Sequence, residues 1–214
     1  MSTMLPPLEI DSWTEEPLSS FTSRITSISP KMLILIDGVA GSGKTTLAVK
    51  LSELLNANIV KTDDISWCAD PVKWDCELID EIITPWQSGK NVAYTPSGWI
   101  KENRSDFIEV DSDKALIIEG TGAARKTLRS ISKYSIWVDT EPKIARERVV
   151  NRDIAAGENG GTVESVTKFA DWWDSLLLPL FLEEKPWKYV DVIVSGDKSD
   201  LSADNIMIHV VQYE

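Results

Sequence analysis

The chain has 214 residues, of which 43% are hydrophobic and 26% are charged, a composition typical of a soluble globular protein with one core. Its formal net charge of −12 at pH 7 argues against stable binding to nucleic acid or to an anionic membrane surface, because both kinds of binding need a positively charged protein surface. No apolar run approaches the ~18 residues of a membrane span, and the acidic N-terminus lacks an export signal. We therefore expect a cytoplasmic protein that binds neither nucleic acid nor membrane.

The first 30 residues differ in character from the rest of the chain. They are polar and carry four prolines, and we expect a partly ordered extension in which residues 18–28 form a short amphipathic helix. Residues 31–214 contain no low-complexity linker and are expected to form a single domain.

Strands and helices are predicted to alternate along this domain. Strands are predicted at residues 32–36, 58–61, 107–110, 115–118, 135–138, 190–194 and 206–211, and from residue 92 to a turn at Pro96-Ser97-Gly98. Helices are predicted at residues 44–55, 72–87, 125–131, 142–156 and 162–184, the last interrupted at Pro179. This alternation favours an α/β fold with a mainly parallel sheet.

A phosphate-binding loop follows the first of these strands. Gly38, Gly43, Lys44 and Thr45 fit the spacing G-x-x-x-x-G-K-[ST], with a buried strand before them and a helix after them. The glycines allow backbone N–H groups to face phosphate oxygens, Lys44 reaches the β- and γ-phosphates, and the Thr45 hydroxyl can ligate Mg²⁺. A chance glycine-rich turn is the alternative, and the flanking strand and helix argue against it. The residues expected to bind the nucleoside triphosphate are Gly38, Gly41, Ser42, Gly43, Lys44, Thr45 and Thr46.

Carboxylates follow two other predicted strands. Asp63 and Asp64 follow residues 58–61 after Thr62, and Glu119 comes directly after residues 115–118. Because ligands bind at the carboxyl edge of a parallel sheet, one of these groups could accept a proton from an attacking hydroxyl, and another could hold the metal or its waters. The alternative is that the Asp63-Asp64 pair only ends the strand and caps the following turn.

Arginines gather on two predicted helices. Arg148 and Arg152 share one face of the helix at residues 142–156, where they could neutralise a transferring phosphoryl group, and Arg152 is the best single candidate. Arg146 lies on another side of that helix, and all three could instead pair with neighbouring acids. Arg125 and Arg129 follow Glu119 closely and could meet an anionic substrate or form an exposed helix face.

The tryptophans, cysteines and single histidine carry weaker signals. Trp67 and Trp99 lie in predicted loops and could stack on a planar or sugar-like acceptor, whereas Trp137, Trp172 and Trp187 are expected in the core. Cys68 and Cys76 are expected to be reduced and half-buried, because their spacing suits neither a disulfide framework nor a zinc site. His209 lies in the last predicted strand, far from every motif, so no histidine relay is expected.

Taken together, these motifs resemble the uridine kinase-like branch of the P-loop kinases. The resemblance rests on the phosphate loop, the Asp63-Asp64 pair, Leu-Ile-Ile-Glu-Gly at 116–120 and Arg-Val-Val-Asn-Arg-Asp at 148–153. Within this branch, the chain resembles a bacterial uridine kinase-like subgroup at Trp172-Trp173 and Glu183. The resemblance implies a three-layer α/β/α P-loop fold with a mainly parallel five-stranded sheet and a helical lid at about residues 142–165.

The resemblance also implies an activity. It implies transfer of the γ-phosphoryl group of ATP, with Mg²⁺, to a hydroxyl group of a small-molecule acceptor. Asp63 would be the general base and a metal contact, Glu119 and Thr45 would lie at Mg²⁺, and Arg148 and Arg152 would belong to the lid. Asp64, Trp67, Trp99 and Arg125 are the candidate acceptor contacts.

The chain departs from the uridine kinase pattern at three points. Ile65 and Ser66 separate the acidic pair from Trp67, whereas uridine kinases have an aromatic residue soon after this pair. The chain has no histidine near these motifs that could bind a pyrimidine. Ile-Ala-Ala-Gly follows Arg152-Asp153 where uridine kinases have an arginine- and glycine-rich segment. A nucleoside-like acceptor is favoured, while a nucleotide, a sugar or a vitamin precursor stays open. A phosphorylated acceptor would need extra cations such as Arg125 and Arg129. The alternative of a different functional class is a regulatory module that binds a nucleotide and hydrolyses it slowly. A homodimer is left open.

Overall fold

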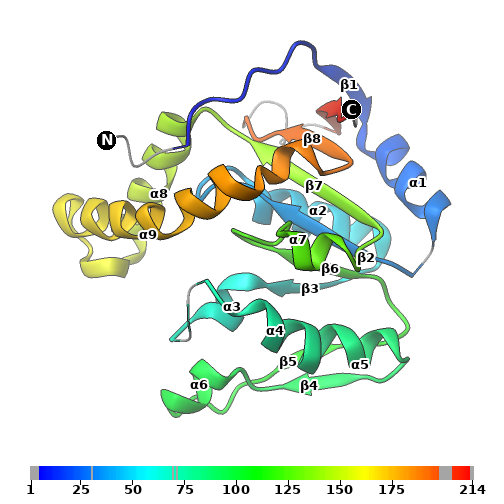
Figure 1. Cartoon of the computed structure of the whole chain (residues 1–214), viewed down its shortest axis with the longest axis horizontal. Helices are drawn as coiled ribbons and strands as arrows, with labels where there is room; N and C mark the ends of the chain where they lie inside the picture. Colours follow the sequence, from blue (N-terminus) through cyan, green and yellow to red (C-terminus); the bar gives the residue numbers. More distant parts are fainter. Residues whose placement is uncertain (1–4, 30, 69, 71, 198–203, 213–214) are drawn as a thin grey trace.

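The computed structural model describes residues 5–29, 31–68, 70, 72–197 and 204–212. Its centre is a seven-stranded sheet in the order β1-β9-β8-β7-β2-β6-β3 (Figure 1). The strands β3, β6, β2, β7 and β8 run parallel, and β9 lies antiparallel between β8 and β1. In that sheet order from the outer β1, the bounds are Thr14–Pro17, Asn205–Val210, Val192–Ser195, Tyr134–Asp139, Leu33–Asp37, Leu116–Glu119 and Asn58–Lys61.

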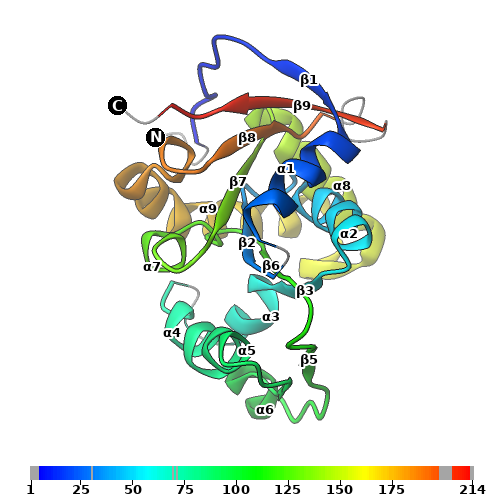
Figure 2. The same ribbon diagram turned by 90° about the vertical axis from the view of Figure 1, so that its right-hand side faces the viewer.

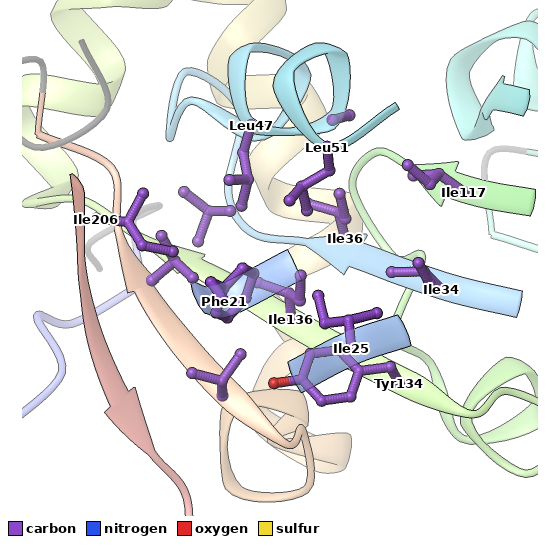
Figure 3. Packing of buried hydrophobic residues seen from close by; sticks show 14 of the residues in the cluster. Phe21, Ile25, Ile34, Ile36, Leu47, Leu51, Ile117, Tyr134, Ile136 and Ile206 are labelled. Carbon is purple, nitrogen blue, oxygen red and sulfur yellow. The ribbon is translucent and has the colours of Figure 1, made fainter. Parts of the chain in front are cut away.

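The parallel strands are apolar on both faces because helices cover both faces. Helices α1 (Leu18–Ile28) and α2 (Lys44–Leu55) cover one face, and α7 (Lys126–Arg129) and α9 (Val163–Glu184) lie on the other (Figure 2). Under α1 and α2, Phe21 and Leu51 pack against strand residues such as Ile36 (Figure 3). The α/β fold with a mainly parallel sheet is therefore confirmed, and so is the helix expected at residues 18–28. The sheet has seven strands rather than the expected five, because β9 and β1 add to the five parallel strands.

The remaining elements follow the strands at the carboxyl edge or cover the β3 side of the sheet. The β3 side carries a continuous helical run, α4 (Asp75–Leu78), the π-helical turn η1 (Ile79–Ile83) and α5 (Thr84–Gln87), next to the small sheet of β4 (Val92–Tyr94) and β5 (Ile108–Val110). At the carboxyl edge lie α3 (Thr62–Ser66), α6 (Ser97–Lys101), α8 (Pro142–Ala156) and the turn η2 (Glu158–Gly160), whereas the turn η3 (Pro186–Lys188) connects α9 to the start of β8. None of the helices in the described part of the chain has the length and apolar character needed to cross a bilayer.

Several local predictions were wrong, each for a tertiary reason. The strand expected from residue 92 ends at Tyr94 and pairs antiparallel with β5 outside the main sheet, and residues 97–101 form a helix where a turn was expected. Helix α9 continues through Pro179, because Pro179 lies on the exposed side, where water can bond the carbonyl group that the proline leaves without a donor. Trp172 is 50% exposed rather than in the core, and Cys68 and Cys76 are exposed free thiols.

Candidate functional site

The phosphate loop connects the carboxyl end of β2, at the middle of the parallel sheet, to the start of α2. Gly43 adopts φ +105° and Gly41 φ +79°, left-handed conformations that side chains rarely tolerate. A Cβ at Gly41 would lie 2.2 Å from the carbonyl oxygen of Ala145 on α8, so the loop passes directly against that helix. The residues expected at the loop thus form the strand–loop–helix arrangement that the motif requires. The loop leads into the N-terminus of α2, and helix N-termini favour the binding of anions.

Lys44 lies folded across this loop. Its side chain is buried, and Nζ donates hydrogen bonds to the carbonyl oxygens of Gly38 (2.9 Å) and Val39 (2.8 Å). Burial lowers the pKa of Lys44, while the carboxylates of Asp37, Glu119 and Asp63 raise it. In the same loop Ser42 Oγ is buried without a hydrogen-bond partner among the described residues. A buried cation and an unsatisfied hydroxyl among glycines fit the oxygens of a polyphosphate.

Two carboxylates lie opposite the loop at the edge of the sheet. Glu119, buried at the end of β6, accepts a hydrogen bond of 3.0 Å from Thr45 Oγ1, and burial raises its pKa. Lys61, at the end of β3, is in register with Glu119, and Asp63 follows as an exposed residue of α3. Asp63 acts electrostatically on both Lys44 and Glu119, so the three charges form one group.

The oxygen atoms of this group suit Mg²⁺. A hydroxyl and carboxylates are the protein ligands that Mg²⁺ accepts beside phosphate oxygens and water. No group of three or more His, Cys, Asp or Glu side chains able to hold a metal occurs in the described part of the chain. Thr45 and Glu119 supply the hydroxyl and carboxylate oxygens that fit such an ion.

The three arginines of α8 have different environments. Arg148 donates a hydrogen bond of 2.8 Å to the carbonyl oxygen of Gly196 and one of 3.5 Å to that of Gly41, so it connects the phosphate loop to the end of β8. Arg152 is 63% exposed, pairs with Asp153 at 2.7 Å, and acts electrostatically on Lys44. Arg146 points to α9 instead, where it contacts Asp171 (2.7 Å) and Asp174 (2.9 Å). Arg148 and Arg152 thus lie with the phosphate loop, whereas Arg146 joins two helices.

The expected aromatic acceptor face is built around an arginine that sequence reasoning did not single out. Arg104 lies over the rings of Trp99 and Trp67, with its guanidinium carbon 4.0 Å and 5.3 Å from the ring centres. Trp67 is 42% exposed, but Trp99 is only 6% exposed beneath Arg104. Asp64 is nearby: burial raises its pKa, and the charges of Lys61 and Arg104 lower it again. A ligand can therefore reach Trp67 and Arg104 more readily than Trp99.

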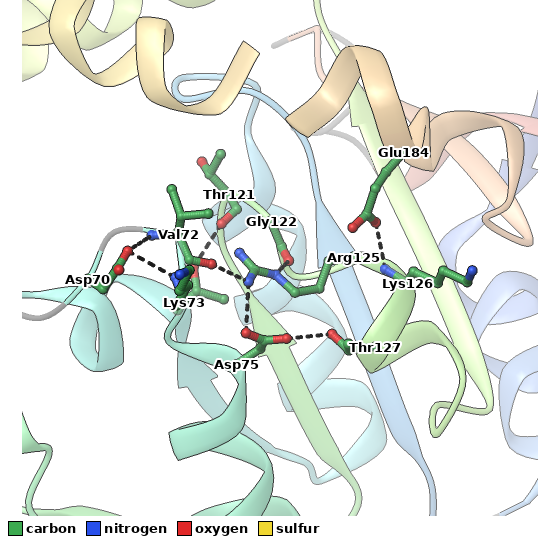
Figure 4. A network of polar contacts seen from close by, with 11 residues as sticks. Asp70, Val72, Lys73, Asp75, Thr121, Gly122, Arg125, Lys126, Thr127 and Glu184 are labelled. Carbon is green, nitrogen blue, oxygen red and sulfur yellow. Dashed lines mark hydrogen bonds and ion pairs between the residues drawn. The ribbon is translucent and has the colours of Figure 1, made fainter. Parts of the chain in front are cut away.

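Arg125 contributes to a polar network at the side of the site (Figure 4). Only 8% of it is exposed, and it donates to the carbonyl oxygens of Val72 (2.6 Å) and Gly122 (3.2 Å) and to Asp75 Oδ1 (3.1 Å). Its guanidinium also lies 4.1 Å from the ring centre of Trp74. These contacts fasten α4 to the loop after β6, so the position of Arg125 does not support the expectation that it contacts the acceptor. Arg129 is engaged similarly, with the Ala124 carbonyl oxygen and Glu184.

Comparisons with known proteins show which family and fold this chain shares. Residues 34–165 match the family described as the AAA domain. A curated relative, “Probable thymidylate kinase” of Metallosphaera sedula, is 27% identical over 135 residues, and the match covers 56% of this chain. It covers 66% of the relative, so this chain spans just under two thirds of that protein's length.

Two solved structures share the fold. A “putative fructose transport system kinase” from Silicibacter sp. TM1040 has a TM-score of 0.53 and 18% identity, over 77% of this chain and 95% of that chain. A “Possible Uridine Kinase” from Bacillus stearothermophilus has a TM-score of 0.51 and 20% identity, over 83% of this chain and 96% of that chain. The fold is thus that of P-loop kinases. The segment matched by the AAA domain covers more than half of the chain and includes the phosphate loop, Asp63 and Glu119, and the chain therefore belongs to the AAA domain family of P-loop proteins.

Proposed function

We propose that the protein is an ATP-dependent small-molecule kinase that transfers the γ-phosphoryl group to a hydroxyl of a nucleoside-like acceptor. The observation that carries the proposal is the convergence of Lys44, the Thr45–Glu119 hydrogen bond and exposed Asp63 at one point of the sheet edge. A triphosphate gripped by the loop would present its end to this group.

Each residue then has a role that its surroundings support. Lys44 exchanges its contacts with the Gly38 and Val39 carbonyl oxygens for phosphate oxygens, with little change of position. Thr45 and Glu119 would hold Mg²⁺, which when bound neutralises charge on the β- and γ-phosphates. Asp63, whose side chain is exposed, accepts the proton of the acceptor hydroxyl as the new bond to phosphorus forms.

The arginines of α8 are proposed to cover the nucleotide. Arg152 is exposed beside Lys44, so its guanidinium can offset charge on the moving phosphoryl group. Arg148 already contacts the backbone at Gly41 and Gly196 and would line the nucleotide on that side. Residues 142–165, which contain α8, would thus serve as the lid.

The acceptor is proposed to bind against Trp67, Arg104 and Asp64. An exposed indole and a planar guanidinium can hold a flat or sugar-like molecule, and Asp64 is one residue from the base. A nucleoside monophosphate is the second candidate, favoured by the similarity to the protein named “Probable thymidylate kinase”. In that case Arg104 is the cation that meets the phosphate.

The test is ADP release from Mg·ATP, measured with a panel of nucleosides, nucleoside monophosphates, sugars and vitamin precursors. A kinase turns over ATP far faster with its acceptor than alone, and mass spectrometry should then find the acceptor one phosphate heavier. ATP hydrolysis that no acceptor accelerates, together with an unchanged acceptor pool, would favour a regulatory nucleotide-binding module instead.

A further inference from the structure

Asp37, the last residue of β2, is a fully buried carboxylate that accepts three backbone hydrogen bonds. Its Oδ1 accepts from the amides of Gly38 (2.7 Å) and Gly122 (2.8 Å), and its Oδ2 accepts from the amide of Ala124 (2.8 Å). Burial raises its pKa, while these amides and the charge of Lys44 lower it again. Burying a charged group is costly, so a carboxylate held this way needs a compensating role in its surroundings.

The three amides belong to two separate segments of the site. Gly38 opens the phosphate loop, whereas Gly122 and Ala124 belong to the loop that follows β6, directly after Glu119. These same two segments meet a second time through the hydrogen bond from Thr45 to Glu119. The hydrogen bond from Thr45 to Glu119 lies at the proposed nucleotide site, whereas the hydrogen bonds of Asp37 lie in the protein interior.

We propose that Asp37 is a positioning residue for the nucleotide: it locks the phosphate loop to the loop that follows Glu119, so that Lys44, Thr45 and Glu119 meet Mg·ATP as one preformed unit. The inference rests on the proposed function, because it presupposes that the loop binds ATP. Asp37 itself would touch neither the nucleotide nor the metal.

A carboxylate suits this position and an amide does not. The carboxylate is acceptor-only and can face all three N–H groups, whereas an asparagine has one accepting oxygen and one NH₂ group. In Asp37→Asn at least one backbone N–H would face another donor, and the negative charge next to buried Lys44 would be lost. The substitution therefore perturbs the lock while it preserves side-chain volume.

Asp191→Asn is the matched control. The Asp191 carboxylate also joins two parts of the sheet, since its Oδ2 accepts from the amide (2.7 Å) and the hydroxyl (2.8 Å) of Ser135. Ser135 is near the start of β7 and Asp191 precedes β8, so this link lies toward the opposite end of the strands from the phosphate loop. Both substitutions should lower the melting temperature, but only Asp37→Asn should alter nucleotide binding.

The experiment measures the dissociation constant of ATP by calorimetric titration, with Mg²⁺ and with EDTA, well below the melting temperature of each folded variant. For Asp37→Asn we expect Mg·ATP binding at one site per chain but weaker by about tenfold or more, and a smaller gain in affinity from Mg²⁺ than in wild type. Asp191→Asn should bind within about twofold of wild type. A purely structural role would lower stability and leave both the affinity and the Mg²⁺ gain unchanged.

Folded Asp37→Asn protein that binds Mg·ATP like wild type would overturn the inference and leave the proposed function standing. Wild-type protein that does not bind ATP would instead remove the proposed function. If Asp37→Asn does not fold, amide hydrogen exchange in wild type decides. The amides of Gly38, Gly122 and Ala124 should then exchange through one common opening that Mg·ADP slows, and independent exchange of the Gly122 and Ala124 amides would contradict the lock.

Discussion

Replacement of Gly41 by alanine tests the packing of the phosphate loop against α8. The substitution forces an L side chain into a left-handed backbone at φ +79°, which costs about 1–2 kcal/mol. Its Cβ would also lie 2.2 Å from the backbone oxygen of Ala145, and relieving such overpacking typically costs about 1–3 kcal/mol. Together we expect a loss of about 2–5 kcal/mol in the free energy of unfolding.

Gly89→Ala separates the two contributions. Gly89 has a similar φ of +76°, but nothing lies within 4 Å of a Cβ built there, so only the backbone strain of about 1–2 kcal/mol applies. Urea unfolding of both variants should show the larger loss for Gly41→Ala, and Mg·ATP affinity should fall in that variant alone. Equal losses in the two variants, with unchanged ATP affinity, would refute close packing of the loop on α8.

Two further predictions concern carboxylates at the sheet edge. Burial, with repulsion from Asp197, raises the pKa of Asp139 to about 6, so its contribution to stability is present at pH below about 4 and is lost as the pH rises through about 6. Asp139→Asn should therefore raise the free energy of unfolding by up to about 3 kcal/mol at pH 8 and change it little at pH 4, and urea unfolding that shows the same gain at both would contradict this. Asp63→Asn should bind Mg·ATP within about twofold of wild type but lose about 10²- to 10⁴-fold in acceptor-dependent turnover, and steady-state rates near wild type would remove Asp63 as the base.

The parts of the site that lie close together in sequence could be predicted well. The phosphate loop is a local signal, because the strand before it, its glycines and the helix after it all occur within residues 32–55. Asp63 and Glu119 could be placed at the same edge because each ends a strand of a parallel sheet.

Roles that depend on distant partners could not be predicted. Two of the three amide partners of Asp37 are 85 and 87 residues away along the chain, and the one local hint is an acidic residue at the end of an apolar strand. The position of Arg125 in the sequence suits a contact with an anionic substrate or an exposed helix face, but Asp75, 50 residues earlier, pairs with it. Likewise the pairing of β4 with β5 outside the main sheet, and the cover that Arg104 provides for Trp99, follow from tertiary packing.

The most direct test of the account is a calorimetric titration of wild-type protein and Lys44→Ala with Mg·ATP. The account predicts one nucleotide per wild-type chain and roughly ten- to hundredfold weaker binding by folded Lys44→Ala, because a buried ammonium that meets phosphate is replaced by a methyl group. Equal affinity of the two proteins, or no binding by wild type, would contradict a nucleotide site at this loop.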